Sequence, residues 1–201
     1  MKRGERRTVN GEPRAVAREY VLTLLASLLL LSLIAVLHYD ALAEWWKTDD
    51  PQIVLHAFRN SPAETLFSPA DWQTLSVGFT PLVTLSFDLD LALAGIQPHF
   101  FYAHQLFAIA VATLLLFVLL EPICGRWIAL LTAAAVAAGP AMTLAAESLM
   151  IRHYVEGLAL AVAALIVWRV RVPDENRNGA GVKYDVVAAG LYLLATLAKE
   201  I

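Results

Sequence analysis

Three long apolar runs constrain this chain more than any other feature of its 201 residues. They occupy residues 20–37, 100–120 and 127–146, and two further candidates follow at 149–168 and 184–201. A helix rises about 1.5 Å per residue, so about 20 residues cross the ~30 Å hydrocarbon core of a bilayer. The chain lacks the alternating ~10-residue segments of an outer-membrane barrel. We therefore predict an all-α polytopic membrane protein with about five transmembrane helices and a long, helical first extracytoplasmic loop.

The basic residues predict how these helices are oriented. With a cytoplasmic amino terminus, eleven of the 15 Lys and Arg residues lie inside, and only Lys47, Arg59, Arg152 and Lys199 lie outside. Cytoplasmic loops carry such an excess of Lys and Arg. We expect an integral protein of the bacterial inner membrane, with a basic cytoplasmic leader (1–19), transmembrane helix 1 (20–42), an extracytoplasmic loop (43–99) and transmembrane helices 2–5 (100–201). The leader and first run also resemble a cleavable signal peptide, but the run exceeds the usual ~7–15 residues.

The loop is too long to be structureless, so we expect it to contain helices of its own. Segments 61–64 and 68–71 both have a Ser N-cap, Pro at the first helical position and an acidic residue at the third. They predict two short surface helices. Residues 81–94 are apolar again, and Gly95 followed by Pro98 ends that stretch. We interpret it as a helix at the outer interface of the membrane and not as a full span.

Two adjacent carboxylates, Asp49 and Asp50, follow the first predicted span. Such a pair can work as a general base, with one carboxylate reaching the reacting hydroxyl and the other holding a partner or a cation. A solvated helix cap before Pro51 explains the same residues without any function.

Further charged residues occur at the outer ends of the later spans. Arg152 and Glu156 are four residues apart on one helix face, where an ion pair is feasible. Lys199 lies about 23 Å along the fifth predicted helix from Tyr184, near the outer surface, where a lysine can also simply extend to the interface. Ionisable groups near a span usually face a polar cavity. We predict one outer cavity in which cations suit a phosphate and carboxylates suit proton abstraction, lined by Asp49, Asp50, Arg59, Arg152, Lys199 and Glu200.

These residues, together with the segments TPLVTLSF (80–87), GIQP (95–98) and LAKE (197–200), resemble the amino-terminal part of GT-C glycosyltransferases. Those membrane enzymes are akin to protein O-mannosyltransferases and the aminoarabinose transferase of lipid A. The resemblance implies transfer of a sugar from a polyprenyl-phosphate carrier on the extracytoplasmic side. It implies Asp50 or Asp49 as the catalytic base, Arg152 and Lys199 as ligands of the carrier phosphate, and Glu200 as a residue that arranges the site. Thr80 stands where related sequences have an Arg.

Two classes of function remain open. GT-C enzymes have many more spans, so we expect the chain to be a truncated segment with little or no transfer activity alone. The alternative is a non-catalytic small integral-membrane subunit of a larger membrane protein complex. Small residues at 133–139 would let a neighbouring helix approach closely in such a complex, although they could equally pack within the chain.

Other chemistry is not indicated. The chain has one cysteine, Cys124, no zinc-type His or Cys cluster and no Gly-rich phosphate loop. We expect no cofactor, and a divalent metal has no support. His104 within a span could ligate a metal or pigment, but the sequence favours a hydrogen-bonded structural role. The expected partners are membrane lipids, a polyprenyl-phosphate sugar and other integral-membrane subunits, and no nucleic acid.

Overall fold

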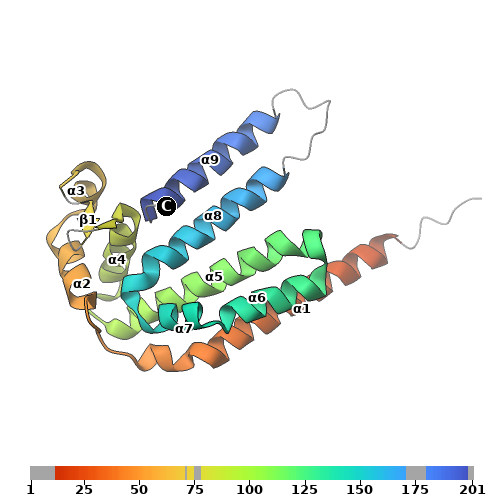
Figure 1. Cartoon of the computed structure of the whole chain (residues 1–201), viewed down its shortest axis with the longest axis horizontal. Helices are drawn as coiled ribbons and strands as arrows, with labels where there is room; N and C mark the ends of the chain where they lie inside the picture. Colours follow the sequence, from red (N-terminus) through yellow and green to blue (C-terminus); the bar gives the residue numbers. More distant parts are fainter. Residues whose placement is uncertain (1–11, 71, 75–77, 171–179, 199–201) are drawn as a thin grey trace, which may run out of the picture.

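A computed structural model of the chain describes residues 12–70, 72–74, 78–170 and 180–198. Long helices run side by side as a bundle (Figure 1), namely α1 (Glu12–His38), α5 (Pro98–Cys124), α6 (Arg126–Ala137), α8 (Arg152–Val170) and α9 (Ala180–Ala198). One end of this bundle carries the short elements that lie between α1 and α5. The prediction of an all-α polytopic membrane protein is confirmed.

Helices that are long and apolar enough to cross a membrane coincide with the first, second and fourth predicted spans. Three helices of the described residues are long and apolar enough, and one bent pair would make a fourth span. The three are Ala17–Ala43, Pro98–Cys124 and Leu149–Arg169. Helix α1 begins at Glu12, inside the predicted leader. The predicted fifth span overlaps α9 as far as Ala198, but α9 is not among the helices that meet these criteria, and residues 199–201 lie outside the described part of the chain.

The third predicted span consists of two helices that meet at a bend and together are long and apolar enough to cross a membrane. Helix α6 ends at Ala137, and α7 (Pro140–Glu147) follows at an angle of 49°. Pro140 starts α7, where its missing N–H leaves no hydrogen bond unmade. A Cβ on Gly139 would lie 3.2 Å from the carbonyl oxygens of Ala135 and Val136, so a larger residue would force a shift. His38 Nε2 lies 3.0 Å from the Ala137 carbonyl oxygen, which links the end of α6 to α1.

We call the elements between the first two spans the cap. They are α2 (Asp50–Arg59), α3 (Pro62–Phe67), the antiparallel pair β1 (Gln73–Thr74) and β2 (Gly78–Phe79), and α4 (Pro81–Ala94). Two short 3-10 helices, η2 (Tyr39–Ala43) and η3 (Leu149–Ile151), lie at the same end of the bundle and precede α2 and α8. The chain between the first two spans therefore contains helices, as predicted.

The two helix starts predicted in the cap have different outcomes. At α3 the Ser61 hydroxyl accepts a bond from the Glu64 amide (3.3 Å), and the Glu64 carboxylate accepts one from the Ser61 amide (2.7 Å), so the predicted capping box is confirmed. The helix predicted at Ser68 is wrong. Its amide donates to the Glu64 carbonyl at 2.8 Å, so Ser68 ends α3 instead of starting a new helix. The Trp72 indole also donates to the Leu66 carbonyl, which folds the chain back.

Helix α4 positions the cap on the bundle. It begins at Pro81 and ends at Ala94, followed by the C-cap Gly95, whose positive φ of +64° is a conformation that glycine adopts readily. This confirms the helix predicted for residues 81–94. It packs against α2, α5, α8 and α9. Phe87 of α4 is fully buried against Phe101 of α5, so an aromatic contact fixes the cap to the bundle.

Candidate functional site

Arg152, the first residue of α8, is the centre of a buried polar network at the cap end of the bundle. Its side chain is 0% exposed. Nη1 donates to Asp90 Oδ2 at 2.5 Å and to Ser86 Oγ at 3.2 Å. Nη2 donates to the Phe101 carbonyl at 2.7 Å, and Nε donates to Gln105 Oε1 at 3.3 Å. The guanidinium therefore joins α4, α5 and α8 through four hydrogen bonds.

Asp90 of α4 supplies the counter-charge to Arg152. Its side chain is 1% exposed, and Oδ1 lies 2.6 Å from His104 Nδ1 on α5. The Arg152 guanidinium also lies 4.3 Å from the centre of the Phe87 ring. A charge buried this deeply is tolerated only when it is paired and hydrogen bonded. The arrangement therefore gives His104 a hydrogen-bonded position, the role that the sequence favoured.

Sequence spacing did not identify the partner of Arg152. The ion pair considered between Arg152 and Glu156 is not formed, because the guanidinium binds Asp90. Glu156 instead accepts a hydrogen bond from Ser86 Oγ at 2.5 Å. Asp90 was visible in the sequence as a charge inside the apolar stretch 81–94, and that is the signal that could have marked it.

Asp50, the first residue of α2, is held by groups from three parts of the chain. Its Oδ2 accepts hydrogen bonds from the Lys47 amide (2.9 Å) and the Tyr102 hydroxyl (3.3 Å), and the Met150 backbone also bonds to the carboxylate. The residue is 1% exposed. Burial raises the pKa of Asp50 above its usual value, although these hydrogen bonds and the charge of Arg152 act against the rise.

The residues just before Asp50 are less enclosed and carry strain. Asp49 is half-buried, and its side chain does not cap α2 because its backbone is already helical (φ −96°, ψ −5°). Thr48 has a φ of +41°, in the left-handed region that β-branched residues rarely adopt. Such strain costs on the order of 1–3 kcal/mol and persists where surrounding contacts fix the backbone. The three hydrogen bonds to the Asp50 carboxylate supply those contacts.

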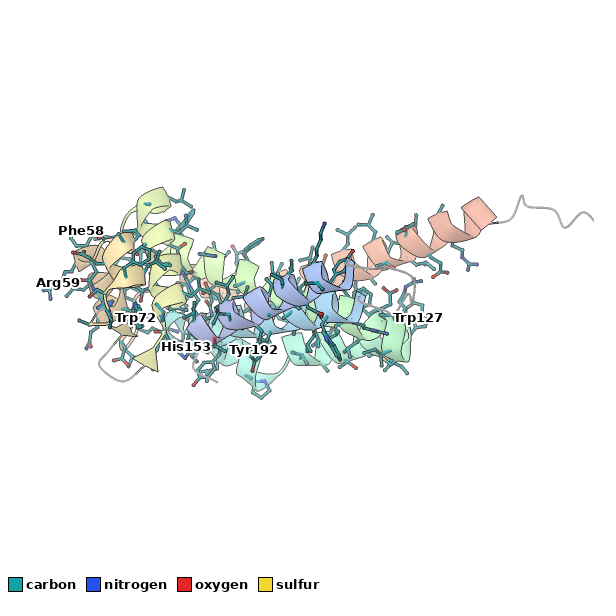
Figure 2. The ribbon with its side chains drawn as sticks, turned by 90° about the horizontal axis from the view of Figure 1, so that it is seen from above. Phe58, Arg59, Trp72, Trp127, His153 and Tyr192 are labelled. Carbon is teal, nitrogen blue, oxygen red and sulfur yellow. The ribbon has the colours of Figure 1, made fainter. Side chains whose placement is uncertain are left out.

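The structure unites part of the predicted site. Asp49 and Asp50 lie at the start of α2 and Arg152 at the start of α8, and the Arg152 charge acts on the Asp50 carboxyl. Arg59 is exposed at the opposite end of α2, about 13 Å along the axis from Asp50, so it is not brought to the carboxylate pair. Figure 2 shows Arg59 beside Phe58 at the outer edge of the cap. Lys199 and Glu200 lie outside the described residues, so their place in the cavity stays a prediction.

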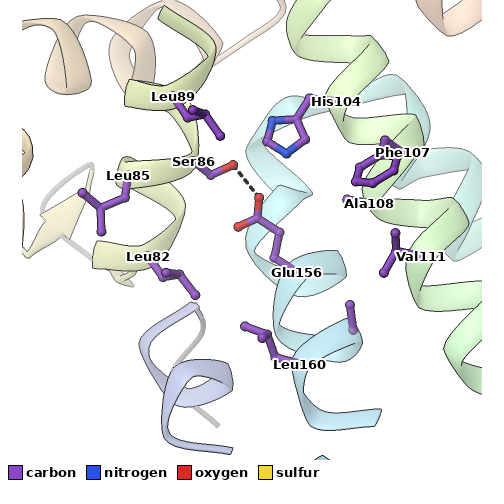
Figure 3. A pocket seen from close by; sticks show the side chains of 11 residues that line it. Leu82, Leu85, Ser86, Leu89, His104, Phe107, Ala108, Val111, Glu156 and Leu160 are labelled. Carbon is purple, nitrogen blue, oxygen red and sulfur yellow. Dashed lines mark hydrogen bonds between the residues drawn. The ribbon is translucent and has the colours of Figure 1, made fainter. Parts of the chain in front are cut away.

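A groove lies beside this network, between α4, α5 and α8, with a volume of about 400 Å³. Its polar side chains are Ser86, His104 and Glu156, and Figure 3 shows the bond between Ser86 and Glu156 inside it. The rest of the lining is apolar and includes Leu82, Leu85, Leu89, Phe107, Val111 and Leu160.

No group of three His, Cys, Asp or Glu side chains converges as metal ligands within the described ranges. Comparison with known proteins gives no match to a family model, to a curated protein or to a solved structure.

Proposed function

We propose that the chain forms the amino-terminal part of a GT-C-like glycosyltransferase, which transfers a sugar from a polyprenyl-phosphate carrier on the extracytoplasmic face of the membrane. One observation carries the proposal. A strained Thr48 precedes two adjacent carboxylates, the second of which is held by three hydrogen bonds outside the spanning helices. Backbone strain and a buried carboxyl group with a raised pKa, here that of Asp50, are typical of catalytic sites.

The two carboxylates have different roles in this proposal. Asp49 is the half-buried member and is the one that can meet an acceptor hydroxyl. It takes the hydroxyl proton while the oxygen attacks the anomeric carbon and the carrier phosphate leaves with the electrons of its bond to the sugar. Asp50 is too enclosed to contact a substrate in this arrangement, and it fixes the backbone that presents Asp49.

The leaving phosphate needs a cation. Arg152 is occupied by Asp90, Ser86, Phe101 and Gln105, so its role here is to organise the site and not to bind phosphate directly. Lys199 keeps the role that the resemblance implies. Lys47 is a second candidate, because its ammonium forms only a partly exposed ion pair with Glu44 at 2.9 Å. Such surface pairs are weak and exchange readily for a better anion.

The test is a sugar-transfer assay. The protein encoded by the reading frame that contains this chain is purified and reconstituted with a panel of polyprenyl-phosphate sugars. Asp49→Asn should lower turnover by about 10²–10⁴, as expected for loss of a positioned base. Lys199→Ala should raise KM for the carrier, because it removes a charge that binds an anion. Asp40→Asn is the matched control, since Asp40 is exposed in η2 and lies outside the site.

Unchanged turnover in the Asp49→Asn, Asp50→Asn double variant would remove the catalytic assignment. Absence of transfer with every donor, together with stable co-purification with other membrane proteins, would replace the enzyme with the non-catalytic subunit.

A further inference from the structure

We infer that the groove between α4, α5 and α8 binds a single-chain amphiphile with an ammonium head group, which Glu156 holds. This site is separate from the carboxylate pair of the proposed enzyme and does not depend on it. Its volume of about 400 Å³ falls within the ~300–1,000 Å³ typical of small-molecule sites.

The groove is polar at one end and apolar at the other. Along α8, Glu156 is followed about 6 Å later by Leu160, and along α5, His104 is followed about 10 Å later by Val111. The polar side chains therefore lie toward the cap end of these helices, and the apolar ones lie deeper in the bundle (Figure 3). A molecule with a polar head and a hydrocarbon tail matches this order.

The charge of the groove selects a cationic head. Glu156 belongs to a membrane-spanning helix, and within the described residues it forms no ion pair. Arg152 forms its ion pair with Asp90, and the charges of Arg152 and His104 act on Glu156 only through space. Among the described residues, Glu156 therefore has no cation in direct contact. A carboxylate in a span is costly and is normally paired. An ammonium group beside Glu156 would supply that pair.

The same lining excludes a phosphate head group. Within the described residues, neither Lys nor Arg lines the groove, whereas Glu156 does. An aminophospholipid would bring its phosphate close to the Glu156 carboxylate, where the lining offers it Ser86 and His104 but neither Lys nor Arg. The ligand class is therefore a long-chain amine in which the nitrogen is attached directly to the hydrocarbon.

The experiment uses the full chain in phosphatidylcholine nanodiscs, with a photoreactive dodecylamine as the probe. Unlabelled dodecylamine should compete, and dodecanol, dodecanoate and dodecyl phosphate should compete at least about tenfold less well, because they lack the charge-assisted bond. Peptide mapping should find the label on α5 or α8 near Phe107 or Leu160. Equal competition by dodecanol would overturn the inference, because binding would then be apolar only.

Four variants sharpen the test. Glu156→Gln keeps the shape and should weaken dodecylamine binding at least about tenfold, whereas Glu147→Gln, exposed at the end of α7 and outside the groove, should leave it unchanged. Ala159→Phe fills the groove and should abolish labelling, which serves as the test if Glu156→Gln does not fold. Lys199→Gln tests whether Lys199 pairs with Glu156 in the wild-type chain. A tenfold rise in dodecylamine affinity in this variant would overturn the inference, because the wild-type chain would then supply its own cation to Glu156.

Discussion

The two ends of the bundle each contain an arginine with acidic partners, but the surroundings differ. At the cap end, the Arg152 and Asp90 side chains are 0% and 1% exposed. At the opposite end, Arg126 pairs with Glu19 and Glu121, each at 2.8 Å, and the side chains are 16%, 65% and 23% exposed, so water reaches all three. Figure 2 labels Trp127, the neighbour of Arg126, far from the cap.

The difference shows that burial, and not the presence of an ion pair, decides how much the protein depends on it. Removing one partner of a buried pair leaves an uncompensated charge and costs about 3–5 kcal/mol. Removing one partner of an exposed pair costs about 0–1 kcal/mol, because water solvates the remaining charge. We therefore expect the cap end to be sensitive and the opposite end to be tolerant.

The largest effect is expected for Arg152→Met. It leaves the buried Asp90 carboxylate without its cation and should lower the free energy of unfolding by about 3–5 kcal/mol. Unfolding of the purified protein by SDS titration measures this. The double variant Arg152→Met, Asp90→Leu removes both charges and should recover much of the loss. Additive losses in the double variant would show that the pair is not the cause.

A smaller loss is expected for His104→Phe. The variant removes the contact of 2.6 Å to Asp90 but leaves Arg152 in place, and the ring fills a similar volume. Loss of one hydrogen bond to a charged group costs about 1.5–3 kcal/mol. The same SDS titration should place this variant between wild type and Arg152→Met. A loss as large as that of Arg152→Met would contradict the ranking.

The cap should also show a pH dependence that arises from Asp88 of α4. Burial raises its pKa from 3.8 to about 6, although the charge of His56 on α2 acts against the rise, and its buried Oδ2 has no hydrogen-bond partner among the described residues. The folded state therefore binds the proton more tightly than the unfolded state does. Its contribution to stability falls as pH rises from 3.8 through about 6 and stays low above that.

Asp88→Asn removes this titration. The variant should have a higher melting temperature than wild type near neutral pH, and the two values should converge as the pH approaches 3.8. Thermal melts across this pH range give the comparison. Parallel curves for the two proteins would mean that another group is responsible.

The smallest effect is expected for Arg126→Met. Glu19 is largely exposed, Glu121 is 23% exposed and so still reaches water, and Thr23 remains to donate to Glu121 at 3.1 Å. The free energy of unfolding should fall by about 0–1 kcal/mol, and the small difference should shrink further at high salt. A loss comparable with that of Arg152→Met would overturn the comparison between the two ends.

Features that depend on neighbours in sequence were predictable. The apolar runs are sufficient for the spanning helices, because span length and hydrophobicity are local properties. The capping box at Ser61 and the stop at Gly95 were predicted for the same reason, since each involves residues within one turn. For helix α2, the sequence indicated only a possible helix cap before Pro51. The Ser-Pro pattern that correctly predicted a helix start at Ser61 was wrong at Ser68, because the Ser68 amide bonds to the last turn of α3.

The composition and order of the chain were enough to define a helical membrane protein and to place a carboxylate pair after its first span. The tertiary structure determined which charged residues pair with each other. Arg152 pairs with Asp90, 62 residues earlier in the chain, and not with Glu156 one turn away. The physical reason is that packing α4 onto α5 and α8 buries Asp90 and Arg152 together, and two charges removed from water must neutralise each other. No local sequence pattern indicates which charged residues, far apart in the chain, become buried next to each other.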